Sequence, residues 1–187
     1  MQIILNEKNY PQIIEKSVKA LKRGGIVVYP SDTVYGIAVD ATSKEAVLKL
    51  DNLKGRHSHQ KYSYNFSDIE MVKKYIDIDK KNQDILDNYL PGPYTFILGK
   101  NISVRIPKDS IIVEIVKHLG KPVTATSANL TGYRPATSIK NLDARIYLKA
   151  DVIIEDPMFI GKAPSTVVDL TCQPPKIIRQ GELLFPR

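Results

Sequence analysis

Apolar residues recur along this chain at two spacings, one typical of helices and the other of strands. Helical spacing that stops at glycine or proline predicts helices over residues 11–23, 84–90 and 110–119. Short β-branched runs predict strands at residues 26–29, 33–39, 94–98, 102–106, 122–125, 152–154, 166–170 and 176–179. We expect 94–98 and 102–106 to form a hairpin, and 157–164 to be a loop.

Two further helices are predicted from capping boxes, in which a hydroxyl and a carboxylate satisfy each other's backbone donors. Thr42 and Glu45 form the first box, and Ser67 and Glu70 form the second. The strands outnumber a simple alternation of strands and helices. We therefore expect an α/β fold with a twisted, mixed parallel and antiparallel sheet and helices on its faces.

Composition narrows the class of protein. With 187 residues, 43% of them hydrophobic, the chain can form one substantial core, so we expect a single domain over residues 1–187. A net charge of +7 favours an anionic partner such as a nucleotide or tRNA.

Cysteine content and hydropathy bear on location. Cys172 is the only cysteine, which excludes an intrachain disulfide and a cysteine-based zinc site. The N-terminal residues lack the pattern of a signal peptide, and no apolar run is long enough to cross a bilayer. We expect a cytoplasmic protein without a membrane partner.

Polar strings stand at the ends of several predicted elements, where α/β proteins build ligand sites. They are Lys54-Gly55-Arg56, Ser127-Ala128-Asn129 and Ser165-Thr166-Val167-Val168-Asp169. Lysine and arginine together suit phosphate oxygens, yet the chain has no G-x-x-x-x-G-K-[ST] phosphate loop. A nucleotide would have to be bound in another way.

Local sequence leaves structural alternatives open for these residues. Lys54 and Arg56 also fit an exposed pair at a helix C-terminus, which the helix dipole favours. Ser127 and Asn129 also fit a turn, because both side chains bond to neighbouring backbone. Ser165 also fits a buried strand end. Arg105 and Arg179, each taken alone, also fit surface charges.

No catalytic nucleophile can be argued from spacing, because neither a Ser-His-Asp order nor a nucleophile elbow is present. His57 and His59 have the spacing of two metal ligands on a strand, but no third ligand is near them in the sequence. We therefore predict no protein metal site and place both histidines in a solvated loop.

Six ordered motifs carry a resemblance to a known family. They are Tyr29-Pro30-Ser31-Asp32-Thr33-Val34-Tyr35-Gly36, Lys54-Gly55-Arg56, Pro91-Gly92-Pro93-Tyr94-Thr95, Val104-Arg105-Ile106-Pro107, Thr126-Ser127-Ala128-Asn129 and Ser165-Thr166-Val167-Val168-Asp169. In this order they resemble the threonylcarbamoyl-AMP synthase family, the YrdC-like domain. The likeness runs from about residue 10 to Gly181, and the chain resembles the short, single-domain form.

The resemblance implies a fold, a reaction and partners. It implies a twisted α/β sheet with a basic concave pocket. The reaction forms threonylcarbamoyl-AMP and pyrophosphate from L-threonine, bicarbonate or CO2, and ATP, with Mg2+ bridging the phosphates. A separate transferase then passes the threonylcarbamoyl group to an adenosine of tRNA. Because the carbamate formed from threonine is itself the nucleophile, the protein supplies positioning and charge neutralisation.

The resemblance also implies roles for particular residues. ATP would be bound by Lys54, Arg56, Ser127, Asn129 and Arg179, with Lys54 and Arg56 as the catalytic cations. Threonine would be bound by Ser31, Arg105 and Ser165.

One stretch departs from the family pattern. The family continues K-x-R with a proline and then K-P-L, whereas this chain has His57-Ser58-His59-Gln60-Lys61-Tyr62-Ser63 after Arg56. An ungapped alignment places Gln60 where the second lysine belongs, and Lys61 one position later, on the other face of a strand. Ser58, Lys61 and Ser63 are therefore weak candidates for ligand contact.

Two alternatives stay open at this point. The first is an RNA- or tRNA-binding module of the same fold without synthase activity, which the net charge of +7 and the altered segment after Arg56 favour. The second is a carbamoyl-adenylate-forming relative that acts on another amine.

Overall fold

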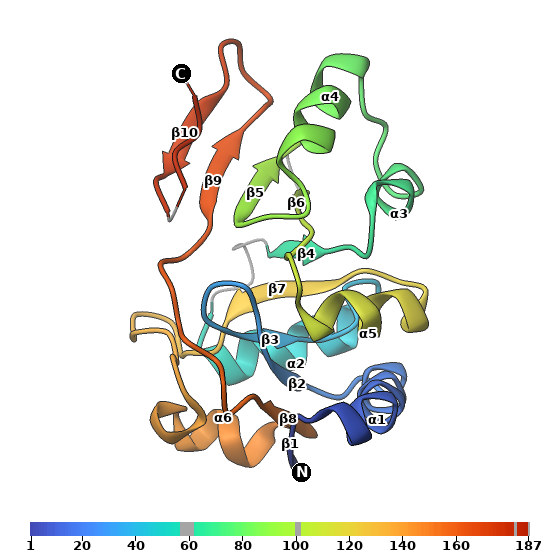
Figure 1. Ribbon diagram of the computed structural model, residues 1–187, viewed down its shortest axis with the longest axis vertical. Coiled ribbons are helices and arrows are strands. Elements are labelled where there is room, and N and C mark those ends of the chain that lie inside the picture. The colour runs from blue at the N-terminus through green and yellow to red at the C-terminus, as the bar shows by residue number, and fades with distance from the viewer. Residues whose placement is uncertain (57–61, 100–101, 182, 187) are drawn as a thin grey trace.

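The computed structural model describes residues 1–56, 62–99, 102–181 and 183–186. Within them a ten-stranded sheet runs the length of the molecule in the order β1-β8-β2-β3-β7-β4-β6-β5-β9-β10 (Figure 1). The strands are β1 (Gln2–Ile4), β2 (Val27–Pro30), β3 (Tyr35–Ala38), β4 (Ser63–Asn65), β5 (Tyr94–Ile97), β6 (Ser103–Arg105), β7 (Val123–Ser127), β8 (Val152–Glu155), β9 (Thr166–Asp169) and β10 (Lys176–Arg179).

The sheet mixes parallel and antiparallel pairs, as the sequence predicts. β8 is parallel to both β1 and β2, and β5 is parallel to β9, whereas β3 is antiparallel to β2 and β7. The predicted hairpin is confirmed by antiparallel β5 and β6. The sheet as a whole extends through both halves of the molecule, with the N-terminus beside β1 and the C-terminus beside β10 at opposite ends (Figure 1).

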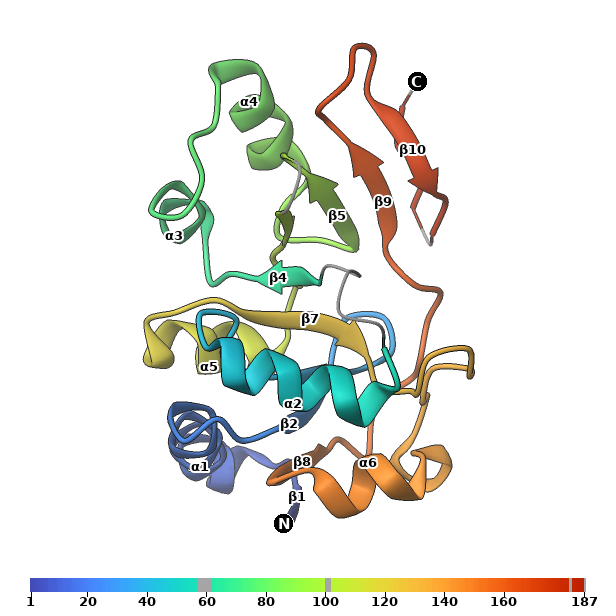
Figure 2. The ribbon, with the colours of Figure 1, turned by 180° about the vertical axis from the view of Figure 1, so that it is seen from behind.

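The sheet has two halves: the first consists of β1, β8, β2, β3 and β7, and the second of β4, β6, β5, β9 and β10. Helices cover both faces of the first half. α1 (Tyr10–Lys22) and α5 (Ile111–Leu119) lie on one face, and α2 (Lys44–Lys54) and α6 (Ala144–Lys149) lie on the other (Figures 1 and 2). β2 alternates accordingly, because Val27 and Tyr29 join the hydrophobic cluster under α1 and α5, whereas Val28 joins the cluster under α2 and α6.

The second half of the sheet carries its helices next to β4 and β5. They are α3 (Ile69–Lys73) and α4 (Lys80–Tyr89), and two short 3-10 helices lie elsewhere, η1 (Glu7–Asn9) and η2 (Ile139–Asn141). Leu86 of α4 and Phe96 of β5 are fully buried, and Phe185 packs its ring 4.9 Å from that of Tyr89. The C-terminal segment is thereby tied to this half.

Both predicted capping boxes are wrong by one residue. Ser43, not Thr42, caps α2 by accepting a hydrogen bond from the Ala46 amide at 3.2 Å. The Thr42 hydroxyl instead donates to Asp40 at 2.6 Å. Likewise Asp68, not Ser67, caps α3 through the Met71 amide. In each case a nearby carboxylate binds the hydroxyl that the sequence assigned to the cap.

No helix in the described part of the chain combines the length and the apolarity that a membrane span requires.

Candidate functional site

A cavity of about 280 Å³ lies where the two halves of the sheet meet. Its walls are formed by residues from several strands and the loops between them, and three of these residues, Arg56, Arg105 and Arg179, are arginines. Its lining is Tyr29, Ser31, Thr33, Val34, Tyr35, Gly36, Arg56, Tyr62, Ser63, Thr95, Arg105, Ala125, Thr126, Ser127, Pro135, Pro164, Ser165, Val167 and Arg179. The predicted basic, concave site is therefore supported by the arginines that line this cavity.

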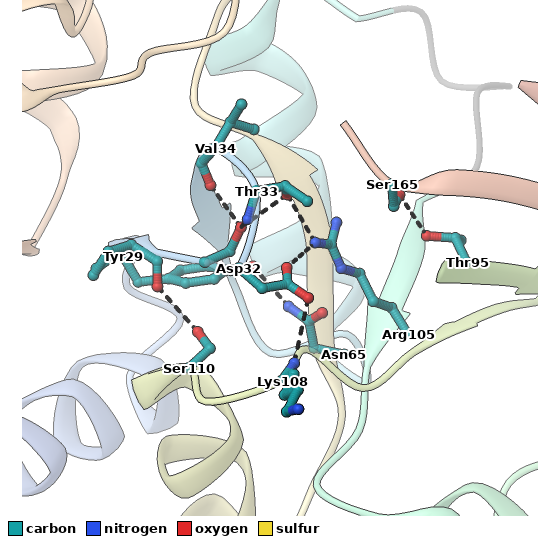
Figure 3. Close-up of polar contacts among 12 residues, drawn as sticks. Tyr29, Asp32, Thr33, Val34, Asn65, Thr95, Arg105, Lys108, Ser110 and Ser165 are labelled. Carbon is teal, nitrogen blue, oxygen red and sulfur yellow. Dashed lines mark hydrogen bonds and ion pairs between the residues drawn. The ribbon is translucent and has the colours of Figure 1, made fainter. Parts of the chain in front are cut away.

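Arg105 is held in place by the turn between β2 and β3. Its Nη2 forms an ion pair with Asp32 and donates a hydrogen bond to Thr33 Oγ1 at 2.8 Å (Figure 3). The backbone amide of Lys108 fixes the other carboxylate oxygen of Asp32. The Arg105 and Asp32 side chains are only 13% and 10% exposed, so the pair is nearly desolvated.

Arg105 keeps part of its hydrogen-bonding capacity. Its buried Nε has no hydrogen-bond partner among the described residues. A buried, unsatisfied donor on an arginine costs free energy unless a ligand or water accepts from it. Arg105 is therefore suited to bind an anion in the cavity.

Ser31 shapes the same turn. Its Oγ donates to the Val34 carbonyl at 2.7 Å and accepts from the Thr33 amide at 3.1 Å. The hydroxyl lies on the cavity wall, so it can contact a ligand only by sharing or exchanging these bonds. Its local role is to fix the turn that carries Asp32 and Thr33.

Arg179 reaches the cavity from β10 across β9. Its guanidinium donates to the Ser165 carbonyl at 3.0 Å and to the Ser165 hydroxyl at 3.2 Å. Ser165 Oγ also lies 2.9 Å from Thr95 Oγ1 of β5 (Figure 3). Partial burial, and then the positive charge of Arg105, lower the pKa of Arg179. The two cations thus act on each other, and an anion in the cavity would relieve this repulsion.

Arg56 enters the site just past the end of α2. Gly55 caps that helix with a φ of 62°, a left-handed conformation that suits glycine. The Arg56 guanidinium lies 4.3 Å from the centroid of the Tyr62 ring, a cation–π contact. The Tyr62 hydroxyl donates to Asp51 at 2.7 Å, and burial raises the pKa of Tyr62. These contacts orient Arg56 along the cavity wall.

Lys54 does not line the cavity. Its side chain is buried, and its Nζ donates to the backbone carbonyls of Ser127 at 2.7 Å and Asn129 at 2.6 Å. Burial, and then the charge of Arg56, lower the pKa of Lys54 to about 7. Because the residue is only 4% exposed, the alternative of an exposed lysine at the helix end is wrong.

Asn129 serves the turn that follows β7. Its amide donates to the carbonyls of Leu130 at 2.8 Å and Tyr133 at 2.7 Å, and its Oδ1 accepts from the Ser127 hydroxyl. Asn129 thus stabilises this turn, and it is not among the residues that line the cavity. Ser127 lies on the cavity wall and opposite Gly36 in the sheet register.

The structure brings together seven of the residues predicted to form the site. They are Ser31, Arg56, Ser63, Arg105, Ser127, Ser165 and Arg179. Ser58 and Lys61 lie outside the described residues, as do His57 and His59. Sequence reasoning assigned no role to Asp32, Thr33, Thr95 or Tyr62. The first three lie inside the six motifs, so their position in those motifs could have identified them as site residues.

A metal site built from side chains alone is not found in the described residues, because no group of three or more His, Cys, Asp or Glu side chains is placed to hold an ion.

Comparisons with known proteins show what this chain is similar to. The profile of the Sua5/YciO/YrdC family, described as telomere recombination, matches residues 19–181. A Methanocaldococcus jannaschii protein, provisionally named a threonylcarbamoyl-AMP synthase, is 32% identical over 95% of this chain and 89% of its own length. The threonylcarbamoyl-AMP synthase of Vibrio campbellii is 29% identical over 93% of this chain and its entire length.

A solved structure shows the same fold. The crystal structure of P. abyssi Sua5 complexed with L-threonine superposes with a TM-score of 0.87 and 25% identity, over 97% of this chain. The chain spans only 57% of that protein's length. The profile match, the relatives and the fold together establish that this chain belongs to the Sua5/YciO/YrdC family.

Proposed function

We propose that this chain is an L-threonylcarbamoyladenylate synthase, a nucleotidyltransferase built as one YrdC-like domain over residues 1–187. It would form threonylcarbamoyl-AMP and pyrophosphate from L-threonine, bicarbonate or CO2, and ATP. A tRNA threonylcarbamoyl transferase would use the product to modify tRNA. The observation that carries the proposal is the convergence of Arg56, Arg105 and Arg179 on one cavity.

The reaction needs no protein nucleophile. The threonine amine adds to CO2 and loses a proton, which gives a carbamate. A carbamate oxygen then attacks the α-phosphorus of ATP, the bond to the bridging oxygen of the β-phosphate breaks, and pyrophosphate leaves. Both reactants are anionic, so the protein must hold two repelling groups together and neutralise charge that shifts to the leaving group.

The cavity suggests a division of labour. Arg105 has an unsatisfied Nε, and its Nη2 donates to the Thr33 hydroxyl, which lies 3.1 Å from the Ser31 hydroxyl, so we assign Arg105 and Ser31 to the threonine. We assign Arg56, Ser127 and Arg179 to the phosphates, and Ser165 to holding Arg179 and contacting threonine. Lys54 and Asn129 would act mainly by positioning Ser127.

The volume of the cavity constrains the arrangement of substrates. At about 280 Å³ it is near the lower end of small-molecule pockets, which span about 300–1,000 Å³. We therefore place threonine and the reacting phosphates inside and the adenosine toward the mouth. Mg2+ would enter with the ATP phosphates. We also propose a cytoplasmic location, because Cys172 has no second cysteine to pair with.

The proposal is tested by pyrophosphate release from ATP, bicarbonate and Mg2+, measured with and without L-threonine. We expect release that depends on threonine and falls at least about tenfold in Arg105→Gln, because a charge-assisted contact to the carboxylate is lost. Arg23→Gln is the matched control, since Arg23 is an exposed arginine at the end of α1 and outside the cavity. Release independent of threonine, or equal in both variants, would contradict the proposal.

The net charge of +7 favours one alternative, a module of the same fold that binds RNA or tRNA without synthase activity. Its affinity for tRNA would fall steeply with salt and would not depend on ATP. Binding isotherms at two salt concentrations, with and without ATP, distinguish it. Replacing threonine by other amino acids in the pyrophosphate assay tests for a relative that uses another amine.

A further inference from the structure

A second hollow, larger than the first, lies between α2, α6 and the C-terminal end of α1. Its volume is about 1060 Å³, and it shares no lining residue with the candidate catalytic cavity. Two leucines on its walls are strongly exposed, Leu48 of α2 by 55% and Leu148 of α6 by 79%. Ile26, Ala46 and Leu53 extend this apolar surface inward. We call it the α2–α6 groove.

Positive charge surrounds the groove. Its lining contains Lys22, Arg23, Lys49, Arg145 and Lys149, against one acidic residue, Glu45. Lys49 and Arg145 have partners, Asp151 at 3.7 Å and Asp143 at 2.9 Å. In the described part of the chain, no acidic side chain lies within ion-pair distance of the other three cations. The groove thus combines an apolar floor with a basic rim, of which Lys22, Arg23 and Lys149 have no ion-pair partner among the described residues.

We propose that the α2–α6 groove binds an acidic amphipathic helix of a partner protein. Such a helix would place leucine-like side chains against Leu48 and Leu148 and carboxylates beside Lys22, Arg23 and Lys149. The groove lies between two helices, so a third helix continues the same packing. Because the two hollows share no residue, the partner and the substrates can bind at the same time.

The chemistry of the groove disfavours two other occupants. Single-stranded RNA is bound largely by aromatic side chains that stack on its bases, and the groove's lining among the described residues has none. A second copy of this chain carries a net charge of +7, so two basic molecules would meet at a basic rim.

The test uses a fluorescent helical peptide of about 20 residues, long enough to be helical in water, with leucines on one face and glutamates elsewhere. A scrambled peptide of the same composition has no apolar face. In anisotropy titrations we expect the amphipathic peptide to bind at least about tenfold more tightly than the scrambled one, because each leucine buries apolar area. We expect added salt to weaken this binding.

Two groove variants and a control locate the binding. The double substitution Leu48→Glu and Leu148→Glu should weaken binding of the amphipathic peptide at least about tenfold. The double substitution Lys22→Glu and Lys149→Glu should weaken it by a similar factor. Leu184→Glu combined with Met158→Glu is the matched control for the leucine pair, since the two side chains are 80% and 84% exposed and outside the groove, and this variant should bind the peptide normally. All sites are exposed, so equal thermal melting curves confirm that the variants fold.

Three results would overturn the proposal. The first is equal affinity for the scrambled peptide. The second is peptide binding that the groove variants leave unchanged. The third is that the same variants abolish tRNA binding or a concentration-dependent dimer, which would assign the groove to RNA or to a second copy. None of these measurements depends on synthase activity.

Discussion

Gly36 shows, at the scale of one residue, how closely the cavity wall is packed. A Cβ at this position would lie 2.4 Å from Tyr29 Cζ. Tyr29 cannot easily move aside, because it is buried and its hydroxyl accepts a hydrogen bond from Asn65 at 2.7 Å. Burial also raises the pKa of Tyr29 to about 12, so the ring stays neutral at physiological pH.

We therefore expect Gly36→Ala to lower the free energy of unfolding by about 1–3 kcal/mol, the usual range for overpacking. Urea titration measures this change. Gly99→Ala is the control, because a Cβ there meets no atom of the described residues within 4 Å, and it should stay within about 0.5 kcal/mol of the wild type. If Gly36→Ala lost no more stability than Gly99→Ala, the Tyr29 ring would be moving aside for the new methyl group.

The buried Lys54 should make the free energy of unfolding depend on pH. Its pKa in the folded protein is lowered to about 7, whereas a lysine in an unfolded chain has a pKa near ~10.4. Between these values the unfolded chain binds a proton that the folded protein has released. Raising the pH through this window therefore stabilises the folded state, by an amount on the order of a few kcal/mol.

The measurement is the free energy of urea unfolding between about pH 7 and pH 10. The advantage of the wild type over Lys54→Met should grow across this range, because the variant has no group to titrate. Lys44→Met, at an exposed lysine on the same helix, should keep the slope of the wild type. Parallel curves for the wild type and Lys54→Met would mean that the two carbonyl acceptors keep Lys54 charged.

At the scale of elements, β10 is an edge strand that delivers Arg179 to the cavity, and Gly181 permits this approach. A Cβ at Gly181 would lie 2.1 Å from the Pro164 carbonyl oxygen and 2.5 Å from the Thr166 amide nitrogen. Both atoms belong to backbone, which cannot rotate away as a side chain does. The end of β10 would have to separate from β9.

We expect Gly181→Ala to lower the free energy of unfolding by about 1–3 kcal/mol. We also expect it to weaken ATP binding about tenfold, because Arg179 would lose its place against Ser165. Urea titration and calorimetric ATP binding measure the two effects, with Gly99→Ala as the control. If Gly181→Ala lowered stability but left the affinity for ATP unchanged, Arg179 would not be a nucleotide-binding residue.

The elements that sequence predicts well are those that bury several residues at one spacing. α1 and α5 each bury five residues, and both helices are confirmed to within one residue at each end. α6 was missed because it has six residues and buries only Ile146. β4 was missed because it has three residues and is held by its neighbours β7 and β6 rather than by its own pattern.

The same distinction applies to the site. The motifs give the order of its residues along the chain, and seven of those predicted reach the cavity. Contacts between distant residues were out of reach, such as Arg105 with Asp32 and Lys54 with the Ser127 carbonyl, each pair 73 residues apart. Lys54 donates to the backbone of a loop that is distant in the sequence. Local sequence does not show whether a lysine will form such contacts or bind a ligand.

At the scale of the whole molecule, the candidate cavity joins the two halves of the sheet. Arg56 and Ser127 belong to the half covered by α2, whereas Arg105, Ser165 and Arg179 belong to the half that contains β5 and β9. An anion bound by both sets would connect the halves and reduce the repulsion between Arg105 and Arg179. Ligand binding should therefore raise the free energy of unfolding of the whole chain.

We expect ATP to raise the free energy of unfolding by about 2.7 kcal/mol at a concentration 100 times its Kd, because only the folded state forms the cavity. Denaturation with and without ATP measures this gain. Arg179→Gln, at one of the arginines assigned to the phosphates, should lose at least about half of it, whereas Arg23→Gln, at the α2–α6 groove, should retain it. If Arg23→Gln lost the gain and Arg179→Gln kept it, the groove rather than the cavity would hold the nucleotide. Because both variants remove one arginine, a general effect of net charge would lower both gains equally.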